Sequence, residues 1–240
     1  MSKLDDLIKE LCPDGVEYKE LKEVLVIKNG SDYKKYGKGD VPVYGSGGIM
    51  TYIDKYVYEK PTVLIPRKGS LDKLYYLETP FWNVDTIYYT IIDTDVALPK
   101  YVYHCLLREH LEKLNTAGGV PSLTQTVLNR VKIPVPPPEI QREIVHILDN
   151  FTALTAELTA ELTARKQQYE YYRDSLLSFG ENQVEWVKIE SICSIQRGRV
   201  MSKEYIAENK GSYPVYSSQT ENNGELGSIS SFDFDGEYLT

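Results

Sequence analysis

The chain has 240 residues, of which 42% are hydrophobic and 26% charged, a composition typical of a globular protein with one or two domains. The net charge of −8 disfavours non-specific nucleic-acid binding over the whole surface, and no apolar run approaches the length of a membrane span. The start of the chain lacks the apolar core of a signal peptide, and three distant cysteines favour a reducing compartment, so we expect a cytoplasmic protein with no membrane partner.

The first predicted elements are a short amphipathic helix and a β-rich region. Residues 3–11 form the helix, which ends at Pro13 and the Asp14-Gly15 turn. Residues 16–98 contain short apolar or alternating runs separated by Gly, Pro, Asp and Asn, the pattern of strands and turns. The predicted strands are Val24–Ile27, Val41–Tyr44, Met50–Ile53, Thr62–Ile65, Leu74–Leu77 and Thr86–Ile92.

The next region changes to helical patterns and ends in prolines. Pro99 stands at a favoured first position of a helix over residues 99–114. Ser122 is a candidate cap for a short helix that ends at Asn129. A loop over 118–121, a strand over Val131–Val135 and the run Pro136-Pro137-Pro138 complete a first domain, residues 1–138.

Residues 139–179 predict one long amphipathic helix. They contain no Gly or Pro, and an α-helix of this length spans about 60 Å. Such a helix cannot bury its apolar stripe against a small domain alone, so we expect a second long helix beside it, as in a coiled coil. Helix-packing positions are predicted at Ile144, Ile147, Phe151, Leu154, Leu158, Leu162, Tyr169, Tyr172 and Leu176.

Within this helix the unit Leu-Thr-Ala-Glu is repeated from Leu154 to Glu161, and a third copy ends in Arg165. One interpretation is low-complexity filler. We favour an adjustable spacer, because each unit lengthens a helix by about 6 Å.

Segments on the two sides of the helix resemble each other. Val16–Leu21 corresponds to Val184–Ile189, and Val41–Tyr44 corresponds to Tyr213–Tyr216, with offsets of 168 and 172 residues. The sequence therefore predicts an α+β protein, in which a β-rich domain, one long coiled-coil-type helix and the start of a duplicated domain (residues 180–240) succeed one another. The second copy stops early, so the chain looks truncated, and Phe232–Thr240 alternates like a strand without its partner.

No catalytic constellation stands out. Pro13-Asp14 before Glu17-Tyr18-Lys19 imitates a nuclease motif, but its halves are too close to lie on neighbouring strands around a metal ion. His104, His110 and His146 have no metal-ligand spacing. We therefore predict no catalytic or metal site.

Binding is the remaining role, and the charge pattern supports it. Residues 28–73 carry nine basic residues against five acidic ones, which allows a local basic face. Single exposed lysines are most often only solvated, whereas loops that combine charge, glycine and aromatic residues suit phosphates and base edges. The candidate DNA-binding residues are Lys34, Lys35 and Lys38 in one loop, Ser46 in a glycine-rich turn, and Arg67, Lys68 and Ser70 after a strand; Asn83, Tyr88 and Tyr89 are weaker candidates and fit a scaffold better.

Several motifs together resemble a known family. They are Gly118–Gln125, Ile133–Ile144, the helix end Arg165–Phe179, the Leu-Thr-Ala-Glu repeats, and Tyr213–Thr220 with Asn222-Asn223-Gly224. The chain resembles the specificity subunit of type I restriction-modification enzymes, cut short within its second target-recognition domain.

The resemblance implies that each recognition domain reads one half of a split double-stranded DNA sequence and that the helices set the separation of the halves. It implies modification (methyltransferase) subunits and restriction subunits as partners. S-adenosylmethionine, ATP and Mg²⁺ would be bound by those partners, and no cofactor by this chain. The exposed helix stripe would also allow self-association.

Two alternatives stay open. A self-sufficient methyltransferase or nuclease would need motifs that the sequence lacks. A coiled-coil adaptor for protein assembly, without DNA specificity of its own, conflicts mildly with the basic and aromatic first domain.

Overall fold

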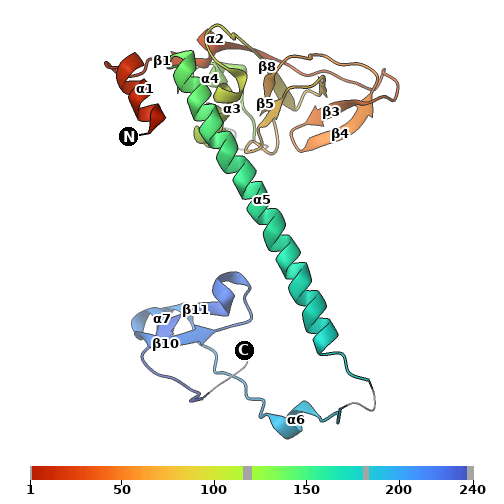
Figure 1. Cartoon of the computed structure of the whole chain (residues 1–240), viewed down its shortest axis with the longest axis vertical. Coiled ribbons are helices and arrows are strands. Elements are labelled where there is room, and N and C mark those ends of the chain that lie inside the picture. Colours follow the sequence, from red (N-terminus) through yellow and green to blue (C-terminus); the bar gives the residue numbers. More distant parts are fainter. Residues whose placement is uncertain (1, 116–120, 181–183, 237–240) are drawn as a thin grey trace. The chain divides into compact units, whose positions relative to one another are not determined.

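The computed structural model describes residues 2–115, 121–180 and 184–236. The chain divides into two compact units, Met1–Gln168 and Tyr169–Thr240, and each is described by itself (Figure 1). Unit 1 opens with α1 (Lys3–Leu11), as predicted, and a reciprocal pair of hydrogen bonds between Ser2 and Asp5 caps this helix. Of the loop predicted over 118–121, only Pro121 lies within the described residues.

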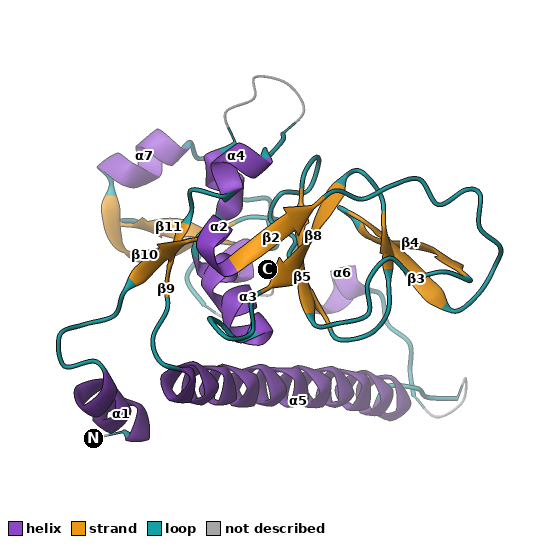
Figure 2. Cartoon of the chain, turned by 90° about the horizontal axis from the view of Figure 1, so that it is seen from above, coloured by secondary structure: helices purple, strands orange, loops and turns teal. Residues whose placement is uncertain are grey.

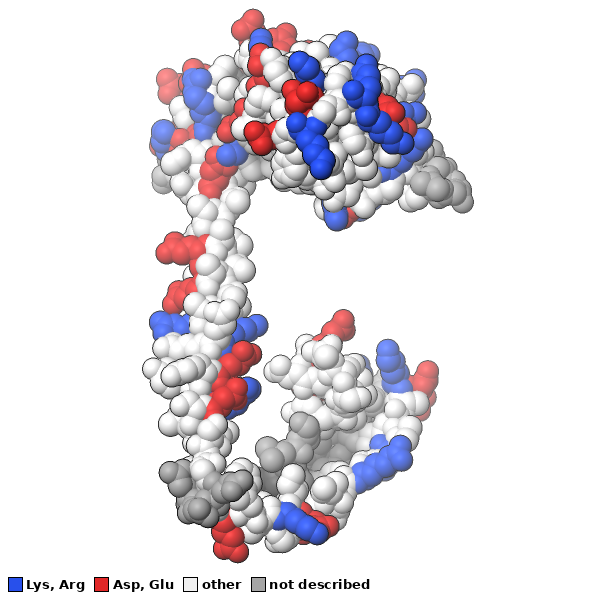
Figure 3. Space-filling model, turned by 90° about the vertical axis from the view of Figure 1, so that its right-hand side faces the viewer, with Lys and Arg blue, Asp and Glu red and all other residues white. Residues whose placement is uncertain are grey.

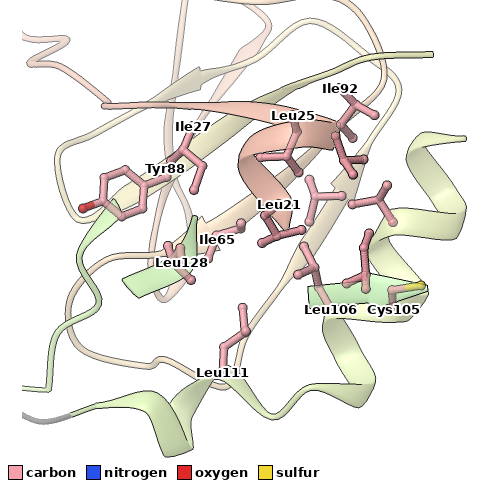
Figure 4. Close-up of a cluster of buried hydrophobic side chains, with 14 of the residues drawn as sticks. Leu21, Leu25, Ile27, Ile65, Tyr88, Ile92, Cys105, Leu106, Leu111 and Leu128 are labelled. Carbon is pink, nitrogen blue, oxygen red and sulfur yellow. The ribbon is translucent and has the colours of Figure 1, made fainter. Parts of the chain in front are cut away.

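A four-stranded antiparallel sheet forms the centre of unit 1, with strand order β2-β8-β5-β6. Every residue of the central strand β5 is buried, because α3 and α2 pack over one face of the sheet and a second cluster with Phe81 and Ile87 covers Leu64 on the other face. Figure 4 shows side chains of the sheet and of these helices meeting in one core, among them Leu21, Ile65 and Leu106. The elements are α2 (Leu21–Val24), β2 (Leu25–Lys28), β5 (Thr62–Pro66), β6 (Tyr75–Leu77), β8 (Ile87–Ile92) and α3 (Pro99–Arg108).

A second, three-stranded sheet has the order β4-β3-β7. The hairpin of β3 (Val41–Gly45) and β4 (Gly48–Ile53) is antiparallel, and β7 (Trp82–Asn83) adds to β3 in parallel. Its small core contains Val43, Ile53 and Trp82. The six strands predicted between Val24 and Ile92 are therefore present, whereas β7 is too short to leave a pattern.

The connection after α3 differs from the prediction of one helix over 99–114. His110 adopts a left-handed backbone conformation (φ 51°), which ends α3 and starts the 3-10 helix η1 (Leu111–Leu114). The break turns Leu111 into the core, where it is 2% exposed. Burial of this leucine outweighs continuation of the helix.

The predicted cap Ser122 was also wrong. The hydroxyl of Thr124 caps α4 (Gln125–Leu128), while Ser122 forms a β-bridge with Lys68. The strand β9 (Lys132–Pro134) then pairs with β1 (Tyr18–Glu20) and closes unit 1.

The long helix is confirmed as one uninterrupted element, α5 (Pro138–Leu176). Its 39 residues correspond to about 58 Å of helix. Pro138 occupies the first turn, where the missing N–H of proline leaves no hydrogen bond unmade. In Figure 2 the helix starts beside α1 and α3, and an ion pair joins Lys3 of α1 to Glu143.

Unit 2 contains two short helices and one hairpin. They are α6 (Ile189–Ile192), α7 (Lys203–Glu208), β10 (Lys210–Tyr216), the 3-10 turn η2 (Glu221–Gly224) and β11 (Glu225–Ile229). The strand predicted at Phe232–Thr240 is absent from its described part, residues 232–236, and the rest lies outside the described residues. Phe232 instead packs its ring on Tyr213, and Asp233 forms an ion pair with Arg199.

The two units share local structure where their sequences correspond. The four-residue helices α2 and α6 start 168 residues apart, and each is closed by an amide that donates to the carbonyl of its first residue. An antiparallel hairpin comes later in both units, β3–β4 in the first and β10–β11 in the second. These shared elements support an internal duplication, and the exact domain bounds 1–138, 139–179 and 180–240 stay a prediction.

Candidate nucleic-acid interface

The residues predicted to contact DNA lie at the two ends of the β3–β4 hairpin. The turn that contains Ser46 closes one end. The loop that carries Lys34, Lys35 and Lys38 lies at the other end, where the amide of Asp54 donates to this loop at 3.1 Å. The candidates therefore form two groups, separated by about 20 Å along β4 from Gly48 to Asp54, at roughly 3.4 Å per residue.

The first group is built on the turn after β5. The amides of Arg67 and Lys68 both donate to the carbonyl of Thr86, at 2.9 and 3.2 Å. The half-buried guanidinium of Arg67 donates to the carbonyl of Asp85 at 3.4 Å and lies 5.9 Å from the centre of the Tyr88 ring. Because a guanidinium has five N–H donors, this arrangement leaves Arg67 able to make a bidentate contact.

The turn that contains Ser46 is attached to the same place. The amide of Ser46 donates to the hydroxyl of Thr86 at 3.3 Å, and the carbonyl of Ser46 accepts from the hydroxyl of Tyr75 at 3.4 Å. Burial raises the pKa of Tyr75, so this hydroxyl keeps its proton and remains a donor. Gly69 has φ +84°, and a Cβ at that position would lie 3.2 Å from Ser46 Oγ. The structure thus brings Ser46, Arg67 and Lys68 together.

The remaining members of this turn differ in exposure. Lys68 is exposed, with its ammonium 3.9 Å from the carboxylate of Asp85, so the two charges only weakly neutralise each other. Ser70 is half-buried at the end of the same turn.

The second group is a basic loop held by aromatic contacts. Lys34, Lys35 and Lys38 are all exposed. The ring of Tyr36 packs edge-on against Trp82 at 4.7 Å, and the indole N–H of Trp82 donates to the backbone of this loop at 3.0 Å. The aromatic residues therefore fix the loop while the ammonium groups stay exposed and able to meet phosphates.

The weaker candidates form scaffold, as the sequence suggested. Asn83 is 1% exposed and donates to the carbonyl of Ile87 at 2.7 Å, and the hydroxyl of Tyr88 donates to the carbonyl of Leu123 at 3.2 Å. Tyr89 packs its ring against aromatic neighbours in the core. The sequence did not single out Thr86, because a threonine at the start of an apolar strand gives no signal.

Figure 3 shows the charge on one face of the molecule. On the part that belongs to unit 1, Lys and Arg side chains gather in several groups, with Asp and Glu side chains between them. An acidic protein thus presents local basic clusters. Such clusters can neutralise individual phosphates without a basic surface over the whole chain.

The predicted packing positions of α5 divide into a covered part and an open part. Ile144 is half-buried against the core of unit 1, and Ile147 is also half-buried. The remaining positions are exposed by between 49% and 71%: Phe151, Leu154, Leu158, Leu162, Tyr169, Tyr172 and Leu176. Those from Leu154 to Leu162 recur every four residues and form a continuous apolar strip, the leucine face.

Polar contacts join α5 to α3. The ammonium of Lys100 lies 2.8 Å from one carboxylate oxygen of Asp149. His104 Nε2 lies 3.7 Å from the other oxygen, too far for a hydrogen bond, and has no hydrogen-bond partner within the described structure. Burial lowers the pKa of His104, and the nearby Asp149 opposes this shift.

Two kinds of feature are missing from the described part of the chain. Its residues form no cluster of three or more His, Cys, Asp or Glu side chains that could hold a metal ion. None of its helices combines the length and apolar character needed to cross a membrane.

In chain order, a β-rich region with two groups of basic and polar loop residues, one long helix and a second region with similar elements define a modular α+β protein. Residues 13–165 and 181–240 match the family "Type I restriction modification DNA specificity domain". The chain belongs to this family.

Curated relatives carry corresponding names. A putative type I specificity subunit of Mycoplasma pneumoniae is 44% identical over 135 residues, 53% of this chain and 49% of the relative. The specificity subunit of the type I restriction enzyme EcoR124I/EcoR124II of Escherichia coli is 45% identical over 127 residues, 49% of this chain and 30% of the relative. The chain thus spans half or less of the length of these relatives.

Solved structures show the same fold. The S subunit of a type I restriction-modification system from M. genitalium has a TM-score of 0.61 at 17% identity, and the match covers 90% of this chain and 63% of that one. A chain from a structure on complex assembly and conformational transition of the type I system has a TM-score of 0.58 at 19% identity, over 72% of this chain and 49% of that chain.

Proposed function

We propose that this chain is the DNA-recognition part of a type I restriction-modification system and that unit 1 reads one half of a bipartite DNA sequence. The observation that carries the proposal is the family match along nearly the whole chain, which includes both groups of candidate residues. The relatives are longer, so the activity and partners of the whole protein belong to this proposal.

The geometry of unit 1 suits a duplex. The two groups of candidate residues are about 20 Å apart along the hairpin, so one group can enter the roughly 12 Å wide major groove while the other lies over the phosphates at its edge. Arg67, with Ser46 beside it, would contact base edges, because a guanidinium binds O6 and N7 of guanine with two hydrogen bonds. Lys34, Lys35 and Lys38 would bind phosphates at the edge of the same groove.

The chemistry would come from partners. We propose that modification subunits dock around the helices and bind S-adenosylmethionine, and that restriction subunits bind ATP and Mg²⁺. This chain would act in the cytoplasm without catalysis of its own. The exposed leucine face requires a second long helix, and another copy of this chain would supply one. The alternative of a coiled-coil adaptor does not explain why unit 1 matches the family.

The test is methylome sequencing of cells that express this chain together with its modification subunit. We expect a new bipartite methylated sequence that is absent from cells with the modification subunit alone. A methylome identical in the two strains would refute the proposed function.

A further inference from the structure

Among the described residues, helix α5 packs against the rest of unit 1 through its first three turns. Ile140 and Gln141 are buried, and the residues up to Asp149 make the remaining contacts. From Asn150 to Leu176 every residue is exposed. This exposed part of the helix, which we call the lever, is about 40 Å long at 1.5 Å per residue.

Gln141 is the polar centre of this attachment. Its side chain is 0% exposed, and both its carbonyl oxygen and its amide nitrogen are hydrogen-bonded. The carbonyl oxygen accepts from the amide of Leu98 at 2.8 Å, and the amide nitrogen donates to the carbonyls of Val96 and Pro136 at 3.1 and 2.8 Å. One side chain thus ties α5 to the segment before α3 and to the proline segment before α5 itself.

The other contacts restrict α5 less. In the ion pair Lys3–Glu143 the lysine is 74% exposed, and in Lys100–Asp149 both side chains are partly exposed, by 34% and 37%. Ion pairs open to solvent are weak and easily rearranged. The side chain of Ile140 packs without directional bonds. The buried amide of Gln141, in contrast, has three backbone partners, so a rotation of the helix about this point would break at least one of these hydrogen bonds.

The length of the lever makes this orientation important. A change of about 10° at Gln141 would move the far end of a 40 Å lever by about 7 Å. One base pair of DNA rises about 3.4 Å, so this movement corresponds to about two base pairs.

We propose that Gln141 is a positioning residue that sets the direction in which α5 leaves unit 1 and thereby determines how strictly the complex selects the number of base pairs between its two half-sites. This inference rests on the proposed function and adds a role for the root of the helix. The number of Leu-Thr-Ala-Glu units would set the preferred spacing, and Gln141 would set the tolerance around it.

The test compares methylation of DNA by the complete complex with its modification subunits. The substrates carry the two half-sites found by methylome sequencing, separated by the native number of base pairs or by one or two more or fewer. The variants are Gln141→Met, which has a similar length but no amide, and Arg142→Gln as a matched control on the exposed neighbour, whose ion pair stays within α5. Lys100→Met weakens the attachment without disturbing the buried amide.

For the wild type and Arg142→Gln we expect the initial rate to fall at least about tenfold when the spacing changes by one base pair. For Gln141→Met we expect the rates at the neighbouring spacings to come within about threefold of the rate at the native spacing. Lys100→Met should broaden the profile in the same direction by a smaller factor, and it replaces Gln141→Met if that variant does not fold.

Two results would overturn the inference: an unchanged spacing profile in a folded variant, or an equal loss of rate at every spacing, which would mean a purely structural role. Wild-type methylation that ignores the spacing altogether would refute the proposed function, and this inference with it.

Discussion

The carbonyl oxygen of Thr86 accepts a hydrogen bond from the amide of Arg67 at 2.9 Å. The hydroxyl of the same threonine accepts from the amide of Ser46 at 3.3 Å. Thr86 thus joins a turn of the four-stranded sheet to the end of the β3–β4 hairpin. The proposed recognition surface combines turns from two sheets and needs such a junction, because no strand pairing connects the two turns in the described part of unit 1.

Replacement of Thr86 by valine should weaken recognition. The variant keeps the shape but removes the hydroxyl, so the Ser46 turn is deprived of a hydrogen bond worth about 0.5–1.5 kcal/mol. We expect a twofold to tenfold lower affinity for the target DNA, measured by fluorescence anisotropy of the complex. Thr86→Ser should restore it. A valine variant that binds target and random DNA with equally reduced affinity would contradict this role.

Arg67→Ala should relax sequence selection at one base pair. A bidentate contact to a base contributes about 1–3 kcal/mol of discrimination, so the preference for the target over a single mismatch should fall about fivefold to 100-fold. Competition binding with a panel of single mismatches measures this. Arg130→Ala removes a charge beside α4 and serves as control, since it should leave the panel unchanged. If Arg67→Ala weakened the binding of every DNA in the panel by the same factor, Arg67 would contact a phosphate and not a base.

The lysines of the basic loop should act without regard to sequence. Simultaneous replacement of Lys34, Lys35 and Lys38 by alanine should weaken binding to target and random DNA alike. The slope of log affinity against log salt should become shallower by about 0.9 for each phosphate that is no longer neutralised, hence by about 2–3. A salt titration of binding checks this, and an unchanged slope would place the lysines away from the duplex.

The leucine face should mediate association through a second helix. A leucine that becomes buried contributes about 1.5–3 kcal/mol, so Leu158→Ala and Leu162→Ala should each weaken self-association at least about tenfold. Sedimentation equilibrium of the chain measures the dissociation constant, with Glu157→Gln on another face of the helix as control. If the wild-type chain stays monomeric at high concentration, the modification subunit rather than a second copy of this chain would cover the leucine face.

Acid should destabilise the contact between α3 and α5. The pKa of His104 lies below its ordinary value of 6.5, because burial disfavours the charged ring, while Asp149 and Lys100 act in opposite directions. As the pH falls below 6.5, His104 binds a proton in the unfolded chain before it does so in the folded chain. The free energy of unfolding present at neutral pH therefore decreases until the pH has passed the lowered pKa of the folded state. Thermal unfolding at about pH 7.5 and about pH 5.5, on either side of the ordinary histidine pKa, should show a smaller acid-induced drop in melting temperature for His104→Gln. An equal drop in melting temperature in the wild type and in His104→Gln would show that His104 does not cause the loss of stability in acid.

The regular helices and strands could be predicted from the sequence, whereas the places where one element ends and another packs against it could not. The helix α5 follows from apolar residues spaced three and four apart, and the strand β5 from a short uninterrupted apolar run. The end of α3 depends on burial of Leu111, which pulls His110 into a left-handed conformation, and no local pattern encodes this. Likewise Ser46 and Arg67 are separate candidates in the sequence, but their meeting at Thr86 depends on how the two sheets pack.

The threonine hydroxyls of the repeated units show that each unit is built alike. Thr155, Thr159 and Thr163 each donate to the carbonyl four residues earlier, at 2.8, 2.7 and 2.9 Å. One more unit would advance the helix by about 6 Å and rotate the rest of the chain by about 40° around the helix axis. DNA rotates by about 70° over two base pairs. Insertion of a unit therefore leaves an angular mismatch of about 30°, the difference between these two rotations, which torsion of the duplex or of the segments that flank the helix must absorb. Relatives with different numbers of units should consequently carry compensating changes at the two ends of the helix and keep their base-contacting loops unaltered.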